Sequence, residues 1–265
     1  MIEARRLAPR FVERVWGANR LSPYFPDSKS KIGEVWFTPG ETYPLLVKFI
    51  FTTEKLSVQV HPGDEYAQRH ERSRGKTEMW HILNAQPGAK IAIGFREEAT
   101  PERLAQAIED GSIERLLNWI PVAAGETYFT RAGVVHAIGA GVTLCEIQQN
   151  SDITYRLYDY GRGRELHVGK AMDVMQTGEY QALREMPVQC EHFATEMVAI
   201  APGEETTAGS DGLLVAVEGE GMIQGEPFQQ GEVWHLRSNG SGGDLAVTSR
   251  NGARLLYVTC GSADR

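Results

Sequence analysis

The sequence predicts a mainly β protein with a few short helices, and two observations support this. The 265-residue chain contains 28 glycines spread between many short apolar runs, and it has few long amphipathic stretches. Short apolar runs bounded by glycine-rich turns are typical of strands, whereas helices show a longer periodicity. A chain of this length can bury a substantial core, as one large domain or as two smaller ones.

Composition and charge narrow the possible partners. The chain has 27 basic and 35 acidic residues, a formal net charge of −8, and no basic block. We therefore expect no nucleic-acid partner, and any phosphate site must be local. No apolar run is long enough for a membrane span, and residues 1–6 lack the apolar core of a signal peptide. Cys145, Cys190 and Cys260 are far apart, which predicts reduced thiols and a cytoplasmic protein.

The first part of the chain predicts two strands after an irregular start. Residues 1–30 contain several prolines and are expected to form an irregular lead-in. Residues 32–37 and 45–51 are expected strands on either side of the turn-forming Pro39-Gly40. Lys48 alternates with apolar residues in the second strand, so it points either inward or, as an edge-strand lysine, into solvent.

Two further segments carry alternating polar residues. Residues 56–61 predict a strand on which Ser57, Gln59 and His61 share one face, because strand side chains repeat every two residues. Residues 75–80 repeat this pattern with Lys76, Glu78 and Trp80. Since a polar loop joins the two segments, we expect them to pair as neighbouring strands.

That pairing predicts a metal site. Gln59, His61 and Glu78 offer an amide oxygen, an imidazole and a carboxylate, which together suit a divalent ion such as Zn²⁺. Each residue alone would be more typical of a hydrogen-bonded or surface side chain. The metal hypothesis therefore depends on the two alternating pairs lying side by side.

A third segment makes the pattern specific. Gly125, Gly133 and His136 have the spacing of the second cupin motif, with Arg131 where that motif usually has proline. Together with the other motifs, this segment resembles the type I phosphomannose isomerases, most of all their short bacterial form. The motifs follow one another within roughly residues 30 to 175, at 44–49, 57–62, 75–80, 135–138, 146–152 and 156–160.

The resemblance implies a cupin-type jelly-roll barrel and a metal-dependent isomerase. Such an enzyme interconverts mannose 6-phosphate and fructose 6-phosphate by proton transfer through an enediol(ate). One Zn²⁺ per chain, or another divalent ion, is then expected, and the substrate is a phosphorylated hexose. The ligands that correspond to those of the family are Gln59, His61, Glu78 and His136.

The same resemblance points to residues for catalysis and substrate binding. Glu146 and Lys76 are the candidates for proton transfer, although a lysine is a poor base unless burial or a nearby cation lowers its pKa. Arg156, with Lys48 and Ser57, is expected to contact the phosphate or the oxyanion. By residue type alone, Arg156 would be a surface arginine, but its place in the motif argues that it faces the sugar.

Short helices are expected in the middle of the chain. Thr100 can cap a helix whose first turn holds Pro101, and Gly111 ends it. Ser112 then caps a second short helix, and another is expected at about 168–175. Fuller-length family members carry a large helical insertion, and we expect the first two helices to replace it beside the barrel mouth.

From Pro187 onward the composition shifts toward short strands and glycine-rich turns. We expect a catalytic metal-binding domain at 1–186 and a smaller, degenerate cupin-like domain without metal at 187–265. His192 and His235 are isolated there and are expected to be structural; alternatively, all strands close one continuous sandwich. The expected strands are 192–201, 213–218, 221–224, 232–237, 244–249 and 254–260.

Two other functions remain open from the sequence. The first is a sugar-phosphate-binding cupin without catalysis, although all four ligands and both Glu146 and Arg156 are present. The second is an iron cupin dioxygenase, whose sites typically use two histidines close in sequence where this chain has Gln59 and His61. No oligomeric state is predicted.

Overall fold

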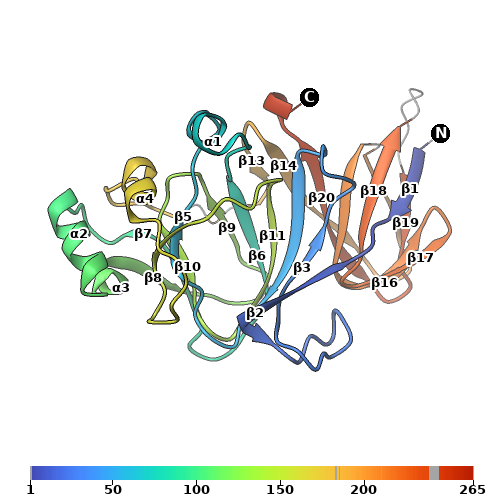
Figure 1. Ribbon diagram of the computed structural model, residues 1–265. Coiled ribbons are helices and arrows are strands. Elements are labelled where there is room, and N and C mark those ends of the chain that lie inside the picture. The colour runs from blue at the N-terminus through green and yellow to red at the C-terminus, as the bar shows by residue number, and fades with distance from the viewer. Residues whose placement is uncertain (1, 183, 185, 210, 239–244, 265) are drawn as a thin grey trace.

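Two facing sheets form the first lobe of the molecule (Figure 1). The computed structural model describes residues 2–182, 184, 186–209, 211–238 and 245–264. One sheet has the order β2 (Arg10–Ala18), β3 (Ile32–Phe37), β4 (Leu45–Phe51), β11 (Val142–Gln149), β6 (Glu78–Ala85) and β9 (Thr127–Thr130). The other has the order β12 (Tyr155–Tyr158), β5 (Val58–Val60), β10 (His136–Ile138), β7 (Lys90–Phe95) and β8 (Leu117–Pro121).

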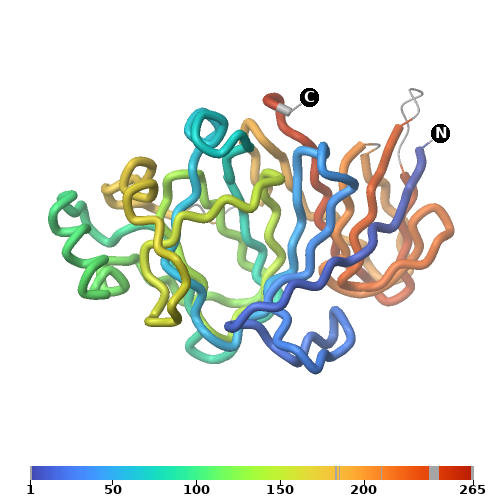
Figure 2. The backbone as a smooth tube through the Cα atoms, viewed as in Figure 1, coloured from blue at the N-terminus to red at the C-terminus, as the bar shows by residue number. Residues whose placement is uncertain are grey.

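A third sheet forms the C-terminal lobe and includes the first strand of the chain (Figure 2). Its main path is β1 (Ile2–Arg6), β18 (Val233–Ser238), β16 (Gly212–Ile223), β20 (Ala253–Cys260), β14 (Phe193–Ile200) and β13 (Val188–Gln189). The strands β15 (Glu205–Ala208), β17 (Glu226–Gln229) and β19 (Leu245–Thr248) complete it. Because β1 pairs with β18 along its length, the N-terminus is built into the C-terminal lobe.

The two faces of the six-stranded sheet have opposite character. On β4, Val47, Phe49 and Phe51 point outward and pack against apolar side chains of the C-terminal sheet such as Val215 and Leu256. The alternate residue Lys48 points inward, between the two sheets of the first lobe. An apolar cluster that includes Trp16, Ile50, Trp80, Ile91 and Tyr128 fills part of this interior. The period of two therefore places Lys48 on the interior face of β4 and its apolar neighbours on the face toward the C-terminal lobe.

The α-helices are α1 (Asp64–Glu71), α2 (Pro101–Glu109), α3 (Ile113–Leu116) and α4 (Val168–Val174), followed near the C-terminus by the 3₁₀ turn Ser262–Asp264. Helices α2, α3 and α4 cover the outer face of the five-stranded sheet, and α1 lies at one end of the first lobe (Figure 1). As predicted, Thr100 caps α2 by accepting a hydrogen bond from the amide of Arg103 (3.3 Å). None of the helices in the described residues is long and apolar enough to cross a membrane.

Helices α2 and α3 pack on the outer face of the five-stranded sheet. Leu104, Ile108 and Ile113 pack with the outward-facing Val58 and Ala92 of the five-stranded sheet. Their apolar residues bury most surface against that sheet, and this determines their position.

The mainly β architecture is confirmed, but several sequence expectations were wrong in detail. Segments 56–61 and 75–80 do not pair: β5 lies between β12 and β10, whereas β6 lies in the opposite sheet. The connection between them holds helix α1, and the lead-in contains strand β2. The two strands expected at 213–218 and 221–224 are the single strand β16, and residue 244 of another expected strand lies outside the described residues.

Candidate metal centre and catalytic cavity

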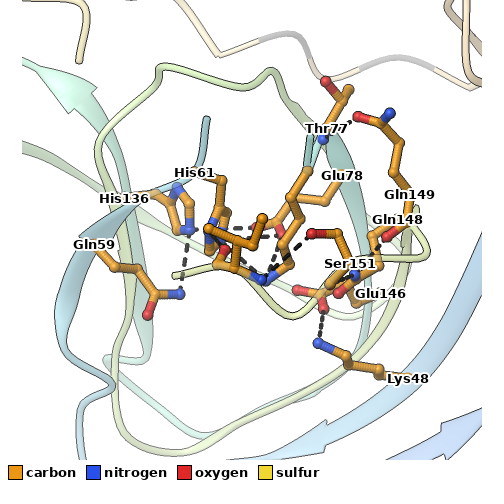
Figure 3. Close-up of polar contacts among 12 residues, drawn as sticks. Lys48, Gln59, His61, Thr77, Glu78, His136, Glu146, Gln148, Gln149 and Ser151 are labelled. Atoms are coloured by element: carbon orange, nitrogen blue, oxygen red, sulfur yellow. Dashed lines mark hydrogen bonds and ion pairs between the residues drawn. The ribbon is translucent and has the colours of Figure 1, made fainter. Parts of the chain in front are cut away.

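Four side chains from both sheets of the first lobe meet in its interior (Figure 3). Gln59 and His136 are directly opposed on β5 and β10, and Glu78 reaches them from β6 in the facing sheet. One ligand atom from each of His61, Glu78 and His136 lies within 4.8 Å of the others, and all three residues are buried. The facing arrangement brings the predicted ligands together without the strand pairing expected from the sequence.

The two histidines are oriented for a cation. Nδ1 of His61 lies 2.7 Å from the carbonyl oxygen of Ile153, and Nδ1 of His136 lies 2.9 Å from that of Val134. These contacts favour a proton on Nδ1, so each Nε2 carries a lone pair that can bind a metal. Burial lowers the pKa of His136 to about 4 and that of His61 well below its usual value. Both rings are therefore neutral at pH 7, as metal ligands must be.

Glu78 gives the strongest indication that a cation belongs here. Both of its carboxylate oxygens are buried, and neither has a hydrogen-bond partner among the described residues. Burial and the nearby Glu146 raise the pKa of Glu78 to about 8. The cationic group nearest to it is Nζ of Lys76, 3.4 Å from Oε2. A buried carboxylate whose oxygens accept no hydrogen bond is stabilised when it binds a metal. Two imidazoles and a carboxylate fit a divalent ion such as Zn²⁺.

Gln59 completes the set through its amide. Its Nε2 lies 3.3 Å from Nε2 of His136, while its Oε1 lies 3.2 Å from the hydroxyl of Ser57. A half-turn of the amide exchanges the two atoms and directs Oε1 toward the cluster. Gln59 can therefore provide a neutral oxygen ligand.

The predicted catalytic and substrate-binding residues line one cavity of about 480 Å³ next to this cluster. The sequence-predicted residues among its walls are Lys48, Ser57, Gln59, Lys76, Glu146 and Arg156. Lys76 borders the metal ligands directly, since its Nζ lies 3.1 Å from Nε2 of His61 and 3.4 Å from Oε2 of Glu78.

Glu146 is held ionised in this cavity. Its Oε2 accepts a hydrogen bond from Nε1 of Trp80 (3.0 Å), and its Oε1 lies 3.3 Å from Nζ of Lys48. Burial alone would raise the pKa of Glu146, but Lys48 and Lys76 outweigh it and lower the value. Burial likewise opposes the charge of Lys48, yet Glu146, Glu34 and other acids raise its pKa overall. A buried carboxylate that stays charged can accept a proton.

Sequence comparison identifies the relatives of this chain. The mannose-6-phosphate isomerase ManA of Bacillus subtilis is 33% identical over an alignment that covers 84% of this chain and 90% of that protein. The chain belongs to the mannose-6-phosphate isomerase family. A mannose-6-phosphate isomerase of Streptococcus mutans is 43% identical over 146 residues, 53% of this chain and 46% of that protein. No family model matches the chain.

Solved structures confirm the fold expected for this family. The mannose 6-phosphate isomerase of Bacillus subtilis superposes with a TM-score of 0.82 at 26% identity, over 96% of this chain and 98% of that one. A protein of Archaeoglobus fulgidus described as a putative mannosephosphate isomerase gives a TM-score of 0.81 at 21% identity, covering 97% of each chain. At that identity the likeness concerns the fold alone.

Sequence reasoning missed several residues of the cavity wall. Arg14, Glu34 and Asp152 line it but were given no role. Glu34 and Trp36 alternate on β3 as Gln59 of β5 does with the following His61, so the inward face of β3 was detectable. Arg14 carried no such signal, because β2 was expected to be irregular.

Proposed function

We propose that this protein is a metal-dependent aldose–ketose isomerase that interconverts mannose 6-phosphate and fructose 6-phosphate. The observation that carries the proposal is the position of the His61–Glu78–His136 cluster next to the cavity that contains the ionised Glu146. Membership of the mannose-6-phosphate isomerase family supports the choice of substrate. The buried catalytic groups also favour an enzyme over a binding cupin without catalysis.

The cation we propose is one Zn²⁺ per chain, held by Gln59, His61, Glu78 and His136. When bound, it acts as a Lewis acid that lowers the cost of negative charge on the substrate oxygens. His61 and His136 supply neutral nitrogen ligands, and Glu78 supplies the only formal charge among the four. The two carboxylate oxygens of Glu78, which accept no hydrogen bond among the described residues, support this assignment.

Isomerisation moves one proton between C1 and C2 of the sugar, and we assign that transfer to Glu146. Oε2 is fixed by Trp80, which leaves Oε1, beside Lys48, as the oxygen that takes the proton from one carbon and returns it to the other. Lys76 is the rival base. Its contacts with His61 and Glu78 favour a different task, the stabilisation of oxygen charge beside the ligands.

The remaining predicted residues surround the space for the sugar. Arg156 is directly opposite Gln59 in the five-stranded sheet, so it stands next to the ligand row on the same face. We assign it to the phosphate or the oxyanion, where a planar guanidinium forms paired hydrogen bonds. Ser57 directly precedes β5 and borders the same cavity as Gln59.

A coupled spectrophotometric assay with mannose 6-phosphate tests the function directly. We expect turnover by the metal-loaded protein, loss of turnover with a chelator, and recovery after Zn²⁺ is restored. Binding of mannose 6-phosphate without turnover by the fully metallated protein would favour the non-catalytic alternative. Turnover that persists after complete metal removal would contradict the role given to the four ligands.

A further inference from the structure

Arg14 enters the catalytic cavity from an irregular part of an edge strand. β2 pairs with β3, but the register shifts between Val12 and Glu13 and again between Glu13 and Ala18. Four consecutive residues, 13–16, line the cavity, which regular alternation between the two faces of a strand would not allow. Such irregularities redirect side chains, and this one turns Arg14 toward the cavity.

Residues of the neighbouring strand β3 fix the position of the Arg14 side chain. Its Nη2 lies 2.8 Å from Oε2 of Glu34, and the same oxygen accepts a hydrogen bond from Nε1 of Trp36 (3.0 Å). A Cβ atom on Gly33 would lie 2.5 Å from Cβ of Arg14 and 2.7 Å from Cζ3 of Trp16. The glycine therefore leaves room for Arg14 to cross β3, and Glu34 fixes its guanidinium through one of five N–H donors.

Two more guanidinium groups line the same cavity. Nε and Nη2 of Arg164 donate hydrogen bonds to the two carboxylate oxygens of Asp159. Nη1 of Arg156 donates a hydrogen bond to the carbonyl oxygen of Glu165 (2.7 Å), while its buried Nε has no hydrogen-bond partner among the described residues. Burial, and then the charge of Arg164, lower the pKa of Arg156, and Arg14 adds to this effect. Three arginines thus crowd one cavity of a chain whose formal net charge is −8.

We propose that Arg14 is a substrate-binding residue that contacts the phosphate group of the hexose phosphate together with Arg156. This inference rests on the proposed function, because it takes the phosphorylated sugar as the ligand. A phosphate dianion relieves the repulsion between the arginines and accepts hydrogen bonds from the donors that Glu34 leaves free. Arg14 then selects phosphorylated over unphosphorylated sugars.

The test compares three variants of the metal-loaded protein. Arg14→Met removes the guanidinium but keeps an apolar stem, and Arg14→Lys keeps the charge and the ion pair with Glu34. Arg10→Met is the matched control, since Arg10 lies on the same strand and over the ring of Trp36 but outside the cavity. Calorimetry gives the dissociation constant of mannose 6-phosphate, and inhibition kinetics give the inhibition constant of inorganic phosphate.

We expect Arg14→Met to raise both constants at least about tenfold, the size expected for a lost charged hydrogen bond, with kcat within about threefold of the parent. For Arg14→Lys both constants should lie between those of the parent and those of Arg14→Met, and for Arg10→Met both should equal those of the parent. Unchanged constants in folded Arg14→Met or Arg14→Lys would overturn the proposal, as would a weaker affinity for the sugar phosphate with an unchanged inhibition constant for phosphate. Absence of turnover in the parent would instead contradict the proposed function, while calorimetry would still test Arg14.

Discussion

Lys48 and Glu146 are directly paired residues of β4 and β11, and their Nζ and Oε1 atoms lie 3.3 Å apart in a buried contact. Lys48 also lies over the ring of Trp36, with Nζ 4.7 Å from the centroid. Only 2% of the Lys48 side chain is exposed, so the ammonium is almost fully shielded from water. We infer that its main task is to keep Glu146 ionised and oriented.

Removing the ammonium should destabilise the protein. Lys48→Met leaves Glu146 without its nearest cation, and breaking a buried ion pair from one side costs about 3–5 kcal/mol. The free energy of unfolding from chemical denaturation measures this loss. The double variant Lys48→Met/Glu146→Gln should recover a large part of it, because no buried charge is then left unpaired. Equal stability of the single and double variants would contradict the pairing.

Glu78 should matter more for metal retention than Gln59. Glu78→Gln removes the only formal negative charge among the ligands, whereas Gln59→Ala removes a neutral oxygen. Elemental analysis of the purified variants should therefore show the larger metal loss in Glu78→Gln. The same metal content in Glu78→Gln and the parent would remove Glu78 from the ligand set.

His81 should make stability depend on pH. Burial, helped by the charge of Arg254, lowers the pKa of His81 from 6.5 to about 4. Between these values the unfolded chain binds the proton more strongly, so stability is complete above about pH 6.5 and falls as pH drops toward 4. The total effect is on the order of 3 kcal/mol.

Unfolding titrations of the parent and of His81→Gln between pH 4 and pH 7 measure this contribution. The stability of the parent should fall more steeply with decreasing pH than that of the variant. Since the metal-binding histidines are common to both proteins, they do not affect the difference between the slopes. Parallel curves would show that His81 does not titrate as described.

The C-terminal lobe should contribute no catalytic residue. His235 lies 5.2 Å from the ring of Tyr43 in an edge-to-face contact, and it borders a different cavity from the metal ligands. His235→Ala and His192→Ala should leave turnover within a few-fold of the parent while lowering stability. If turnover of a folded His235→Ala protein fell by more than about a hundredfold, the C-terminal lobe would contribute to catalysis, contrary to this prediction. Such a loss corresponds to about 2.7 kcal/mol in the activation barrier.

The sequence predicts much of the site but not how it is assembled. Alternation alone placed Gln59 beside His61 and Lys76 beside Glu78, because the period of strand side chains is local. The choice of partner strand is not local. The polar sequence between the two segments is compatible with a hairpin loop between paired strands. It is equally compatible with a connection to the opposite sheet that contains helix α1. Only packing against the rest of the first lobe decides between them.

Arg14 shows a second limit. A period-two pattern detects an inward residue only where the strand is regular, and the register shifts in β2 remove that pattern. Likewise, the glycine at 33 signals a close approach in the folded protein but does not name the side chain that needs it. The division into domains at 186/187 stays a prediction, and the pairing of β1 with β18 adds the first strand to the C-terminal lobe.

Proton exchange during turnover in D₂O tests the central claim, that Glu146 transfers the proton in a metal-dependent isomerase. The parent should convert mannose 6-phosphate to fructose 6-phosphate with some solvent deuterium at C1 of the ketose and at C2 of the aldose. Folded, metal-loaded Glu146→Gln should lose isomerisation and exchange together, by about a hundredfold or more. The claim would be contradicted if Glu146→Gln isomerised the substrate and exchanged deuterium at the rates of the parent, while Lys76→Met did neither. That result would assign the proton transfer to Lys76.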